Sequence, residues 1–228
     1  MKIISALFLL IFMAVPSLSF GKALASSNSN ITNNMLKKPK LLFLSGSARK
    51  SSLNKMLAHN AFELAKGLGA DVTFIDLKDY PMPIYDGDLE TNEGLPEKAL
   101  ELKKLFAEHD GVFIASPEYN GSISPLLKNT LDWISRQNKT GEPIDAYQNK
   151  VVAMGCASPG RISCQRGPLS LQIMLSSIGV VVLPKKINVL QAPGKFNEAG
   201  LLTDVDNYEQ LKSVIAEFIR ITTAIKNG

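Results

Sequence analysis

Short apolar runs that alternate with longer amphipathic stretches constrain this chain more than any other feature. The runs cover residues 41 to 45, 71 to 77, 110 to 116, 150 to 156 and 180 to 184. A strand that is buried on both faces of a parallel sheet shows this kind of continuous apolar run. The alternation therefore predicts an α/β fold, in which a doubly wound five-stranded parallel sheet forms the middle layer of a three-layer α/β/α arrangement. Right-handed crossovers favour the strand order 2-1-3-4-5.

The amphipathic stretches have the spacing of helices, with apolar residues recurring every three or four positions. They cover residues 51 to 69, 97 to 109, 124 to 136, 168 to 179 and 207 to 225. In doubly wound sheets, ligands bind beyond the carboxyl ends of the strands, where the strand order reverses. The loops after the first, third and fourth apolar runs are therefore the predicted place of a ligand site.

The first 25 residues differ from the rest of the chain. They hold a lysine at the start, an uncharged apolar run at residues 3 to 15, and an Ala-Leu-Ala sequence before Ser26. This layout is typical of a secretory signal peptide with a small-residue cleavage site. The apolar run is short for a membrane span, so we expect no stable span in the mature chain.

We therefore predict a signal peptide at residues 1 to 25, a flexible linker rich in Ser and Asn at residues 26 to 38, and one globular domain at residues 39 to 228. This organisation predicts export, either to the periplasm or out of the cell. Met35 offers a second reading, because "MLKKPKLLFLSGSARK" is a natural start for a protein whose first strand follows directly. If translation begins there, the protein is cytoplasmic, and this alternative stays open.

The net charge points to no polyanionic partner. The formal charge is +4, and it falls to +2 when the leader is removed, because Lys2 and Lys22 leave without any acid. The remaining Lys and Arg residues are scattered and interleaved with Asp and Glu. Since no basic cluster with interleaved aromatic residues is present, we expect no nucleic-acid binding.

Cysteines and histidines give no sign of a metal site or a nucleophile. The two cysteines form no disulfide framework, and we expect them to be unpaired, because Cys156 ends a buried strand while Cys164 lies in a loop. A Cys156–Cys164 bridge in an oxidising compartment is the alternative. His59 and His109 fall within predicted helices and are expected to pack or face solvent. No set of His, Cys or carboxylate residues has the spacing of metal ligands, so we predict no metal.

The loop after the first strand reads "SGSARKSSLN". It is neither a dinucleotide fingerprint nor a Walker loop. It nevertheless gathers groups that bind phosphate: the hydroxyls of Ser47 and Ser52, the guanidinium of Arg49, and the N-terminus of the helix that follows. The alternative is a simple strand-to-helix turn with a serine N-cap and a solvent-facing arginine. This loop alone leaves both readings open.

The loop after the third strand contains "SPEYNGS". Pro117 restricts the backbone, Tyr119 supplies a flat aromatic edge, and Asn120 and Gly121 tolerate positive φ. Such a loop can present backbone N–H and C=O groups to a planar ligand, and beside a phosphate cradle it suits flavin mononucleotide (FMN). The alternative is a long turn whose tyrosine caps the core.

Together "GSARKSSLN", "DYPMPIYDGDLE" and "SPEYNGSISPLLKNTLDWISR" resemble the NAD(P)H-dependent FMN reductase family, which includes quinone, azo-dye and chromate reductases. The resemblance covers about residues 40 to 187 and implies a flavodoxin-like, FMN-binding reductase domain at residues 39 to 228. It implies that the first loop holds the FMN phosphate, that the third lines the isoalloxazine, and that the loop after the fourth strand adds a contact. The implied FMN-binding residues are Ser47, Arg49, Ser52, Asn54, Pro117, Glu118, Tyr119, Asn120 and Ser158.

Of two later segments, one departs from the family pattern and the other lies beyond the resemblance. Family members tend to have a Gly-Gly pair where this chain has Ser163 and Cys164, and a long side chain where Pro168 stands, so the resemblance does not extend to the shape of the substrate opening. Residues 191 to 204 are read either as a lid or as a surface loop.

The resemblance also implies the activity. NADPH or NADH would deliver hydride to flavin N5, and a quinone, azo compound or metal oxyanion would accept the electrons. Because the flavin carries the redox step, we predict no catalytic side chain. The family forms homodimers or homotetramers, which makes Tyr85, Trp133 and Arg136 candidates for the subunit contact. For Trp133 the alternative is a position in the core.

The alternative function is that of an FMN-binding electron carrier, or a regulatory flavoprotein, without NAD(P)H turnover. Export keeps this alternative open, because free NADPH is not expected outside the cytoplasm. Electron carriers of this fold are acidic and have a phosphate loop rich in Thr and Ser, whereas this chain has a net positive charge and no threonine in that loop.

Overall fold

The computed structural model of the protein describes residues 37 to 137 and 144 to 228. The predicted signal peptide, and the predicted linker as far as residue 36, lie outside the described residues. The strands are β1 (Lys40–Ser45), β2 (Asp71–Phe74), β3 (Gly111–Ala115), β4 (Val151–Ala157), β5 (Val181–Val182) and β6 (Ile187–Val189). The helices are α1 (Leu53–Gly67), α2 (Gly87–Glu93), α3 (Glu97–Glu108), α4 (Pro125–Ser135), α5 (Arg166–Ser177) and α6 (Val205–Asn227), and a 3-10 turn, η1, spans Leu77–Asp79.

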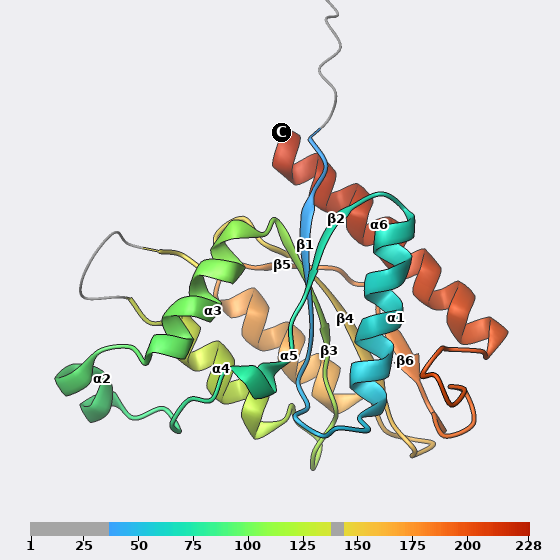
Figure 1. Cartoon of the computed structure of the whole chain (residues 1–228), viewed down its shortest axis with the longest axis horizontal. Coiled ribbons are helices and arrows are strands. Elements are labelled where there is room, and N and C mark those ends of the chain that lie inside the picture. The colour runs from blue at the N-terminus through green and yellow to red at the C-terminus, as the bar shows by residue number, and fades with distance from the viewer. Residues whose placement is uncertain (1–36, 138–143) are drawn as a thin grey trace, which may run out of the picture. The chain divides into compact units, whose positions relative to one another are not determined.

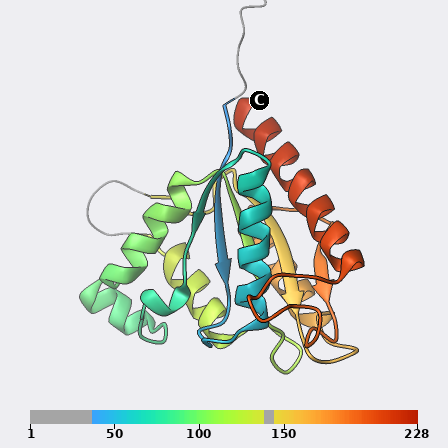
Figure 2. The ribbon, with the colours of Figure 1, turned by 45° about the vertical axis from the view of Figure 1, so that its right-hand side comes forward.

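All strand pairs are parallel, and the sheet order is β2-β1-β3-β4-β5, with β6 also paired to β4 (Figure 1). This confirms the predicted order and the doubly wound fold. Helices cover both faces of the sheet (Figure 2). A hydrophobic core lies between the sheet and the helices on each face. Along each strand, side chains enter the two cores in turn, because successive residues of a strand point to opposite faces. In β1, Leu41 and Phe43 pack with α1 and α6, while Leu42 and Leu44 pack with α3, α4 and α5.

The edge of the sheet next to β4 is built in two pieces. β5 pairs with Val151 and Val152 at the start of β4, and β6 pairs with Gly155, Cys156 and Ala157 at its end. The sequence predicts only one strand here, at residues 180 to 184. β6 was missed because the polar sequence Pro-Lys-Lys separates it from β5, and because Asn188 interrupts its own apolar run.

The helix α2 was also missed in the sequence, and the end of β2 was predicted too far along the chain. α2 lies in the segment read only as part of a motif, and it begins where the Asp86 side chain accepts hydrogen bonds from the backbone N–H groups of Asp88 and Leu89. The predicted second strand ends at Phe74 rather than at residue 77, because Asp76 caps η1 and turns the chain. Both differences arise from local capping by aspartate, which apolar periodicity does not reveal.

The two histidines have the structural roles expected of them. His109 is buried, with Nδ1 2.6 Å from the carbonyl oxygen of Leu105 and Nε2 2.8 Å from the hydroxyl of Thr73. His59 lies beside the rings of Phe62 and Phe74. Over the described residues, no cluster of His, Cys, Asp or Glu could hold a metal ion, and no helix is long and apolar enough to cross a membrane.

Candidate functional site

The loops after β1, β3 and β4 lie together at the carboxyl edge of the sheet, at the bottom of Figure 1. They enclose a cleft of about 370 Å³, a size within the range of small-molecule sites. Eight of the nine predicted binding residues line it, and Asn120 does not. The lining residues are Ser47, Arg49, Ser51, Ser52, Leu53, Asn54, Pro117, Glu118, Tyr119, Ala157, Ser158, Pro159 and Pro193.

Gly46 lets the loop after β1 approach the loop after β3. Its N–H donates to the carbonyl of Ala115 at 2.9 Å, and its carbonyl accepts from the hydroxyl of Ser124 at 2.5 Å. A Cβ at this position would lie 3.1 Å from Leu127 Cβ and 3.3 Å from Pro117 Cδ. Any larger residue would therefore push the two loops apart.

The loop after β1 has the donors of an anion site. Ser52 is the N-cap of α1, with its hydroxyl 3.3 Å from the N–H of Lys55, and the Ser47 hydroxyl lies 3.3 Å from the N–H of Arg49. The Arg49 side chain is exposed, and no ion pair or hydrogen bond to its guanidinium occurs within the described residues. A free guanidinium, two hydroxyls and a helix N-terminus fit a phosphate group.

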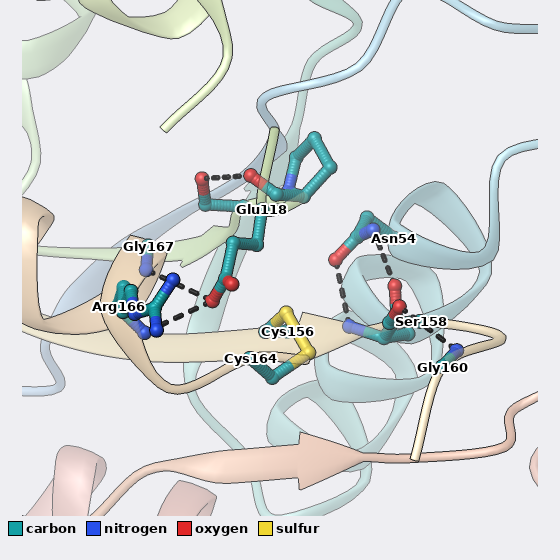
Figure 3. The surroundings of a disulfide bond; sticks show 11 residues. Asn54, Glu118, Cys156, Ser158, Gly160, Cys164, Arg166 and Gly167 are labelled. Carbon is teal, nitrogen blue, oxygen red and sulfur yellow. Dashed lines mark hydrogen bonds between the residues drawn. A yellow bond between two sulfur atoms is a disulfide. The ribbon is translucent and has the colours of Figure 1, made fainter. Parts of the chain in front are cut away.

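Asn54 ties the loop after β1 to the end of β4. Its amide Nδ2 donates to the carbonyl of Ala157 at 2.9 Å, and its Oδ1 accepts from the N–H of the same residue at 2.9 Å (Figure 3). The side chain is buried, so this pair of bonds replaces solvent for both backbone groups. Asn54 thus positions one wall of the cleft, and its predicted contact with a phosphate stays a prediction.

The loop after β3 forms a tight two-residue hairpin. Tyr119 N–H donates to the carbonyl of Ser122 at 2.9 Å, and the reverse bond measures 3.1 Å. The central residues, Asn120 and Gly121, have φ of 52° and 80°, which confirms the expected positive φ and defines a type I′ turn. Tyr119 is 45% exposed, so it does not cap the core. Its N–H is used by the turn, whereas the N–H groups of Glu118 and Asn120 make no hydrogen bond within the described residues, and of these two residues only Glu118 lines the cleft.

Glu118 joins this loop to α5. Its Oε2 accepts from the backbone N–H groups of Arg166 and Gly167, each at 3.0 Å (Figure 3). Gln165, the N-cap residue of α5, makes no side-chain cap, so the glutamate from a distant loop satisfies the helix terminus instead. A Cβ on Gly167 would lie 3.0 Å from Glu118 Cβ, so glycine is needed for this close approach.

The expectation that the cysteines are unpaired was wrong. Cys156 and Cys164 form a disulfide, with their Cα atoms 5.6 Å apart (Figure 3). The loop after β4 doubles back on itself, so that a strand end and a loop residue meet. Cys164 has φ of 62°, in the left-handed region, and this turns the chain back toward the sheet. The apolar pattern shows where β4 ends and contains no sign of this reversal.

Residues after β6 complete the cleft. Ser158 N–H donates to the carbonyl of Val189, and Ala192 N–H donates to the carbonyl of Ser158, both at 3.0 Å. Pro193 follows and lines the cleft. The start of the segment read as a lid or a surface loop is therefore a fixed wall. Ser51, Leu53, Ala157 and Pro159 also line the cleft beside residues that were predicted, whereas no sequence signal points to Pro193.

A second polar cluster, formed by Tyr85, Glu90 and Arg136, holds α2 and the segment before it against the end of α4. Arg136 Nε donates to Glu90 Oε2 at 2.9 Å, and the Tyr85 hydroxyl donates to the same oxygen at 2.8 Å, which raises the pKa of the tyrosine. Trp133 is fully buried, and its indole N–H donates to the carbonyl of Pro83 at 2.8 Å. Trp133 is therefore a core residue, and its candidacy for a subunit contact was wrong.

The fold is flavodoxin-like, and the cleft lies beyond the carboxyl ends of the strands, where doubly wound sheets bind their ligands. Residues 39 to 193 match the family model described as NADPH-dependent FMN reductase. The chain belongs to this family and is an oxidoreductase that uses FMN and NAD(P)H, as the resemblance in its loops predicts.

Named relatives agree with this membership. An NAD(P)H:quinone oxidoreductase of Solanum tuberosum is 33% identical over 196 residues, covering 82% of this chain and 94% of the relative. A quinone reductase of Escherichia coli K12 is 32% identical over 151 residues, covering 66% and 77%. Among solved structures, the flavoenzyme NAD(P)H:(acceptor) oxidoreductase FerB of Paracoccus denitrificans matches with a TM-score of 0.70 and 27% identity, covering 83% of this chain and 99% of FerB.

We predict that Asn54→Ala lowers the free energy of unfolding by about 2 to 4 kcal/mol, because it leaves the buried N–H and C=O of Ala157 without partners. Urea unfolding followed by circular dichroism measures this. Asn92→Ala is the matched control: Asn92 is exposed on α2, and its replacement should change the value by less than about 0.5 kcal/mol. Equal effects in the two variants would contradict the positioning role of Asn54.

Proposed function

We propose that this protein is an NAD(P)H-dependent FMN oxidoreductase whose acceptors are quinones and similar small oxidised molecules, and that its cleft holds the FMN. The observation that carries this proposal is the meeting of the phosphate-type loop after β1 and the flat polar turn after β3 in one cleft at the carboxyl edge. When bound, FMN supplies the redox chemistry, taking a hydride from the nicotinamide and passing two electrons to the acceptor.

The loop after β1 would bind the phosphate. Arg49 offers a positive charge that no carboxylate of the described residues neutralises, and the hydroxyls of Ser47 and Ser52 lie beside it at the N-terminus of α1. These groups fix one end of the ligand and so determine which part of it reaches the β3 turn. Their contribution is binding and orientation.

The turn after β3 would hold the planar ring. Tyr119, whose ring is exposed, and Glu118 line the cleft together with the phosphate loop, and the N–H of Glu118 makes no hydrogen bond within the described residues. Donors at this position favour a ring that carries negative charge after reduction. Of the lining residues, only Arg49, Glu118 and Tyr119 have ionisable side chains, and Glu118 is occupied in capping α5. The lining is thus suited to holding a redox cofactor and offers little for acid–base catalysis.

The names of the relatives from Solanum tuberosum and Escherichia coli support quinones as acceptors. A planar oxidant needs only to stack on a bound flavin, so azo compounds fit the same proposal. Reduction of metal oxyanions rests on the family resemblance alone.

We further propose that the protein is exported and forms a homodimer or homotetramer. The Cys156–Cys164 disulfide supports export, because such bonds persist in oxidising compartments. N-terminal sequencing of the mature protein should start at Ser26, whereas a start at Met35 would support the cytoplasmic alternative. For assembly, Ile84 is 86% exposed beside Tyr85 and is a candidate contact. Light scattering that finds a monomer would reject the oligomer.

An absorption experiment separates the reductase from the carrier. We expect the purified chain from Ser26 onward, supplied with FMN, to show visible flavin bands that bleach when NADPH or NADH is added without oxygen. The bands should return when a benzoquinone is added. A bound flavin that neither nicotinamide reduces would instead support the electron-carrier or regulatory alternative.

We predict that Arg49→Ala weakens FMN binding by about 1 to 3 kcal/mol, or roughly 5- to 150-fold in Kd, since it removes a charge-assisted hydrogen bond. Quenching of flavin fluorescence measures the Kd. Arg49→Lys should recover part of the loss because it keeps the charge. The neighbouring Lys50→Ala is the control for a general loss of positive charge, and an equal effect of both alanine variants would contradict a specific phosphate contact.

A further inference from the structure

The Cys156–Cys164 disulfide joins β4 to the loop that follows it, which is one of the three loops around the cleft. Cys156 is 0% and Cys164 1% exposed. The residues between them include Ala157, Ser158 and Pro159, which line the cleft. The bond therefore closes a nine-residue loop, one part of which is a wall of the binding site.

The two halves of this loop are held in different ways. The first half is tied to β6 and its following segment, through Ser158 and through the carbonyl of Gly160, which accepts from the N–H of Gln191 at 3.3 Å. For residues 161 to 164, no hydrogen bond or ion pair to other described residues is present. Cys164 is buried, while Arg161 and Ile162 are exposed. The disulfide is thus the anchor of the second half.

The second half leads directly to the opposite wall. Two residues after Cys164, the N–H groups of Arg166 and Gly167 bind the carboxylate of Glu118, which lies next to Tyr119 in the turn after β3. A continuous connection thus runs from β4 through the disulfide to the start of α5, and through Glu118 to the β3 turn (Figure 3). The two walls of the cleft are joined along this path.

The backbone conformation of Cys164 is one that we expect to change when the disulfide is broken. A φ of 62° is unfavourable for a residue with a side chain, and it persists only where the surroundings enforce it. Once the sulfur atoms separate, residues 161 to 165 lose their anchor, and Cys164 can relax to negative φ. The start of α5 is then free to shift, and Glu118 with it.

We propose that the Cys156–Cys164 disulfide positions the two walls of the cofactor cleft, so that the protein retains FMN tightly only in its oxidised form. This inference rests on the proposed FMN site. A dithiol reductant reverses the state: the S–S bond breaks, its sulfurs gain two electrons and two protons, and the dithiol becomes a disulfide. The cleft then loses its preorganisation, and the cost of ordering it falls on FMN binding.

The first test compares one protein in two redox states. The chain from Ser26 onward is treated with a phosphine reductant, freed of it without oxygen, and titrated with FMN beside the untreated protein. Mass spectrometry after alkylation in denaturant verifies two free thiols. We expect the Kd for FMN to rise about tenfold on reduction. An unchanged Kd in fully reduced protein would refute the inference.

Variants separate positioning from general destabilisation. Cys156→Ala with Cys164→Ser removes the bond and leaves the cost of positive φ at residue 164, whereas Cys156→Ala with Cys164→Gly removes both the bond and that cost. The Ser variant should bind FMN as weakly as the reduced protein, the Gly variant should recover part of the loss, and neither should respond to the phosphine. At saturating FMN, kcat with NADPH and a quinone should stay within about twofold of the oxidised protein, while half-saturation requires more FMN. A fall in kcat of the same size at saturating FMN would indicate a collapsed site and contradict a positioning role.

Linkage supplies an independent measurement. If FMN binds the oxidised form more tightly, it must oppose reduction by the same factor. In an oxygen-free glutathione buffer, saturating FMN should shift the midpoint for disulfide reduction about 30 mV lower for a tenfold preference. A midpoint that FMN does not move would overturn the inference. If the oxidised protein binds no FMN at all, the proposed FMN site itself fails, which is a different result from equal binding in the two states.

Discussion

The parallel pairing of β1, β3 and β4 is the constraint on which the site depends. Ser45 pairs with Ala115, and Ala115 pairs with Gly155, so β1 and β3 end level with each other and β4 runs two residues further, to Ala157, at the same edge of the sheet. The N–H of Gly46 continues this ladder by binding the carbonyl of Ala115. Because the strands are parallel, the loops that follow them leave in the same direction and must share the space beyond the edge. A cleft at this point follows from topology, before any side chain is specified.

The central sheet could be predicted from the sequence because its signal is local. A strand buried on both faces must be apolar throughout, so β1, β3 and β4 are visible as continuous runs. The edge of the sheet lacks this constraint, and polar residues therefore divide it into β5 and β6 without a pattern that marks the division. α2 depends on capping by Asp86 more than on an apolar face, which is why periodicity does not detect it.

In the candidate site, too, the features that depend on local sequence could be predicted, and the contacts between distant parts of the chain could not. The positive φ at Asn120 and Gly121 follows from residue types that tolerate it, and a serine N-cap was one of the two readings of the loop after β1; the structure assigns that cap to Ser52. Asn54 binds Ala157, 103 residues further along the chain, and Glu118 binds the N-terminus of α5, 48 residues further along. Such partners are chosen by the tertiary fold. The family resemblance implied ligand contacts for both, whereas the structure shows that both hold the walls of the cleft in place.

If the Cys156–Cys164 disulfide shapes the cleft as proposed, the compartment of the protein affects how it binds FMN. The two readings of the N-terminus predict different compartments. A leader that directs export would deliver the chain to an oxidising compartment, where the Cys156–Cys164 bond forms and persists. A start at Met35 would keep the same chain among cytoplasmic reductants, where a disulfide that FMN does not protect tends to open. The nicotinamide donor is plentiful in the second compartment and is not expected in the first. An exported protein would therefore hold its flavin firmly and depend on another supply of electrons. A cytoplasmic protein would have an ample supply of the nicotinamide donor, and its cleft would bind FMN more weakly.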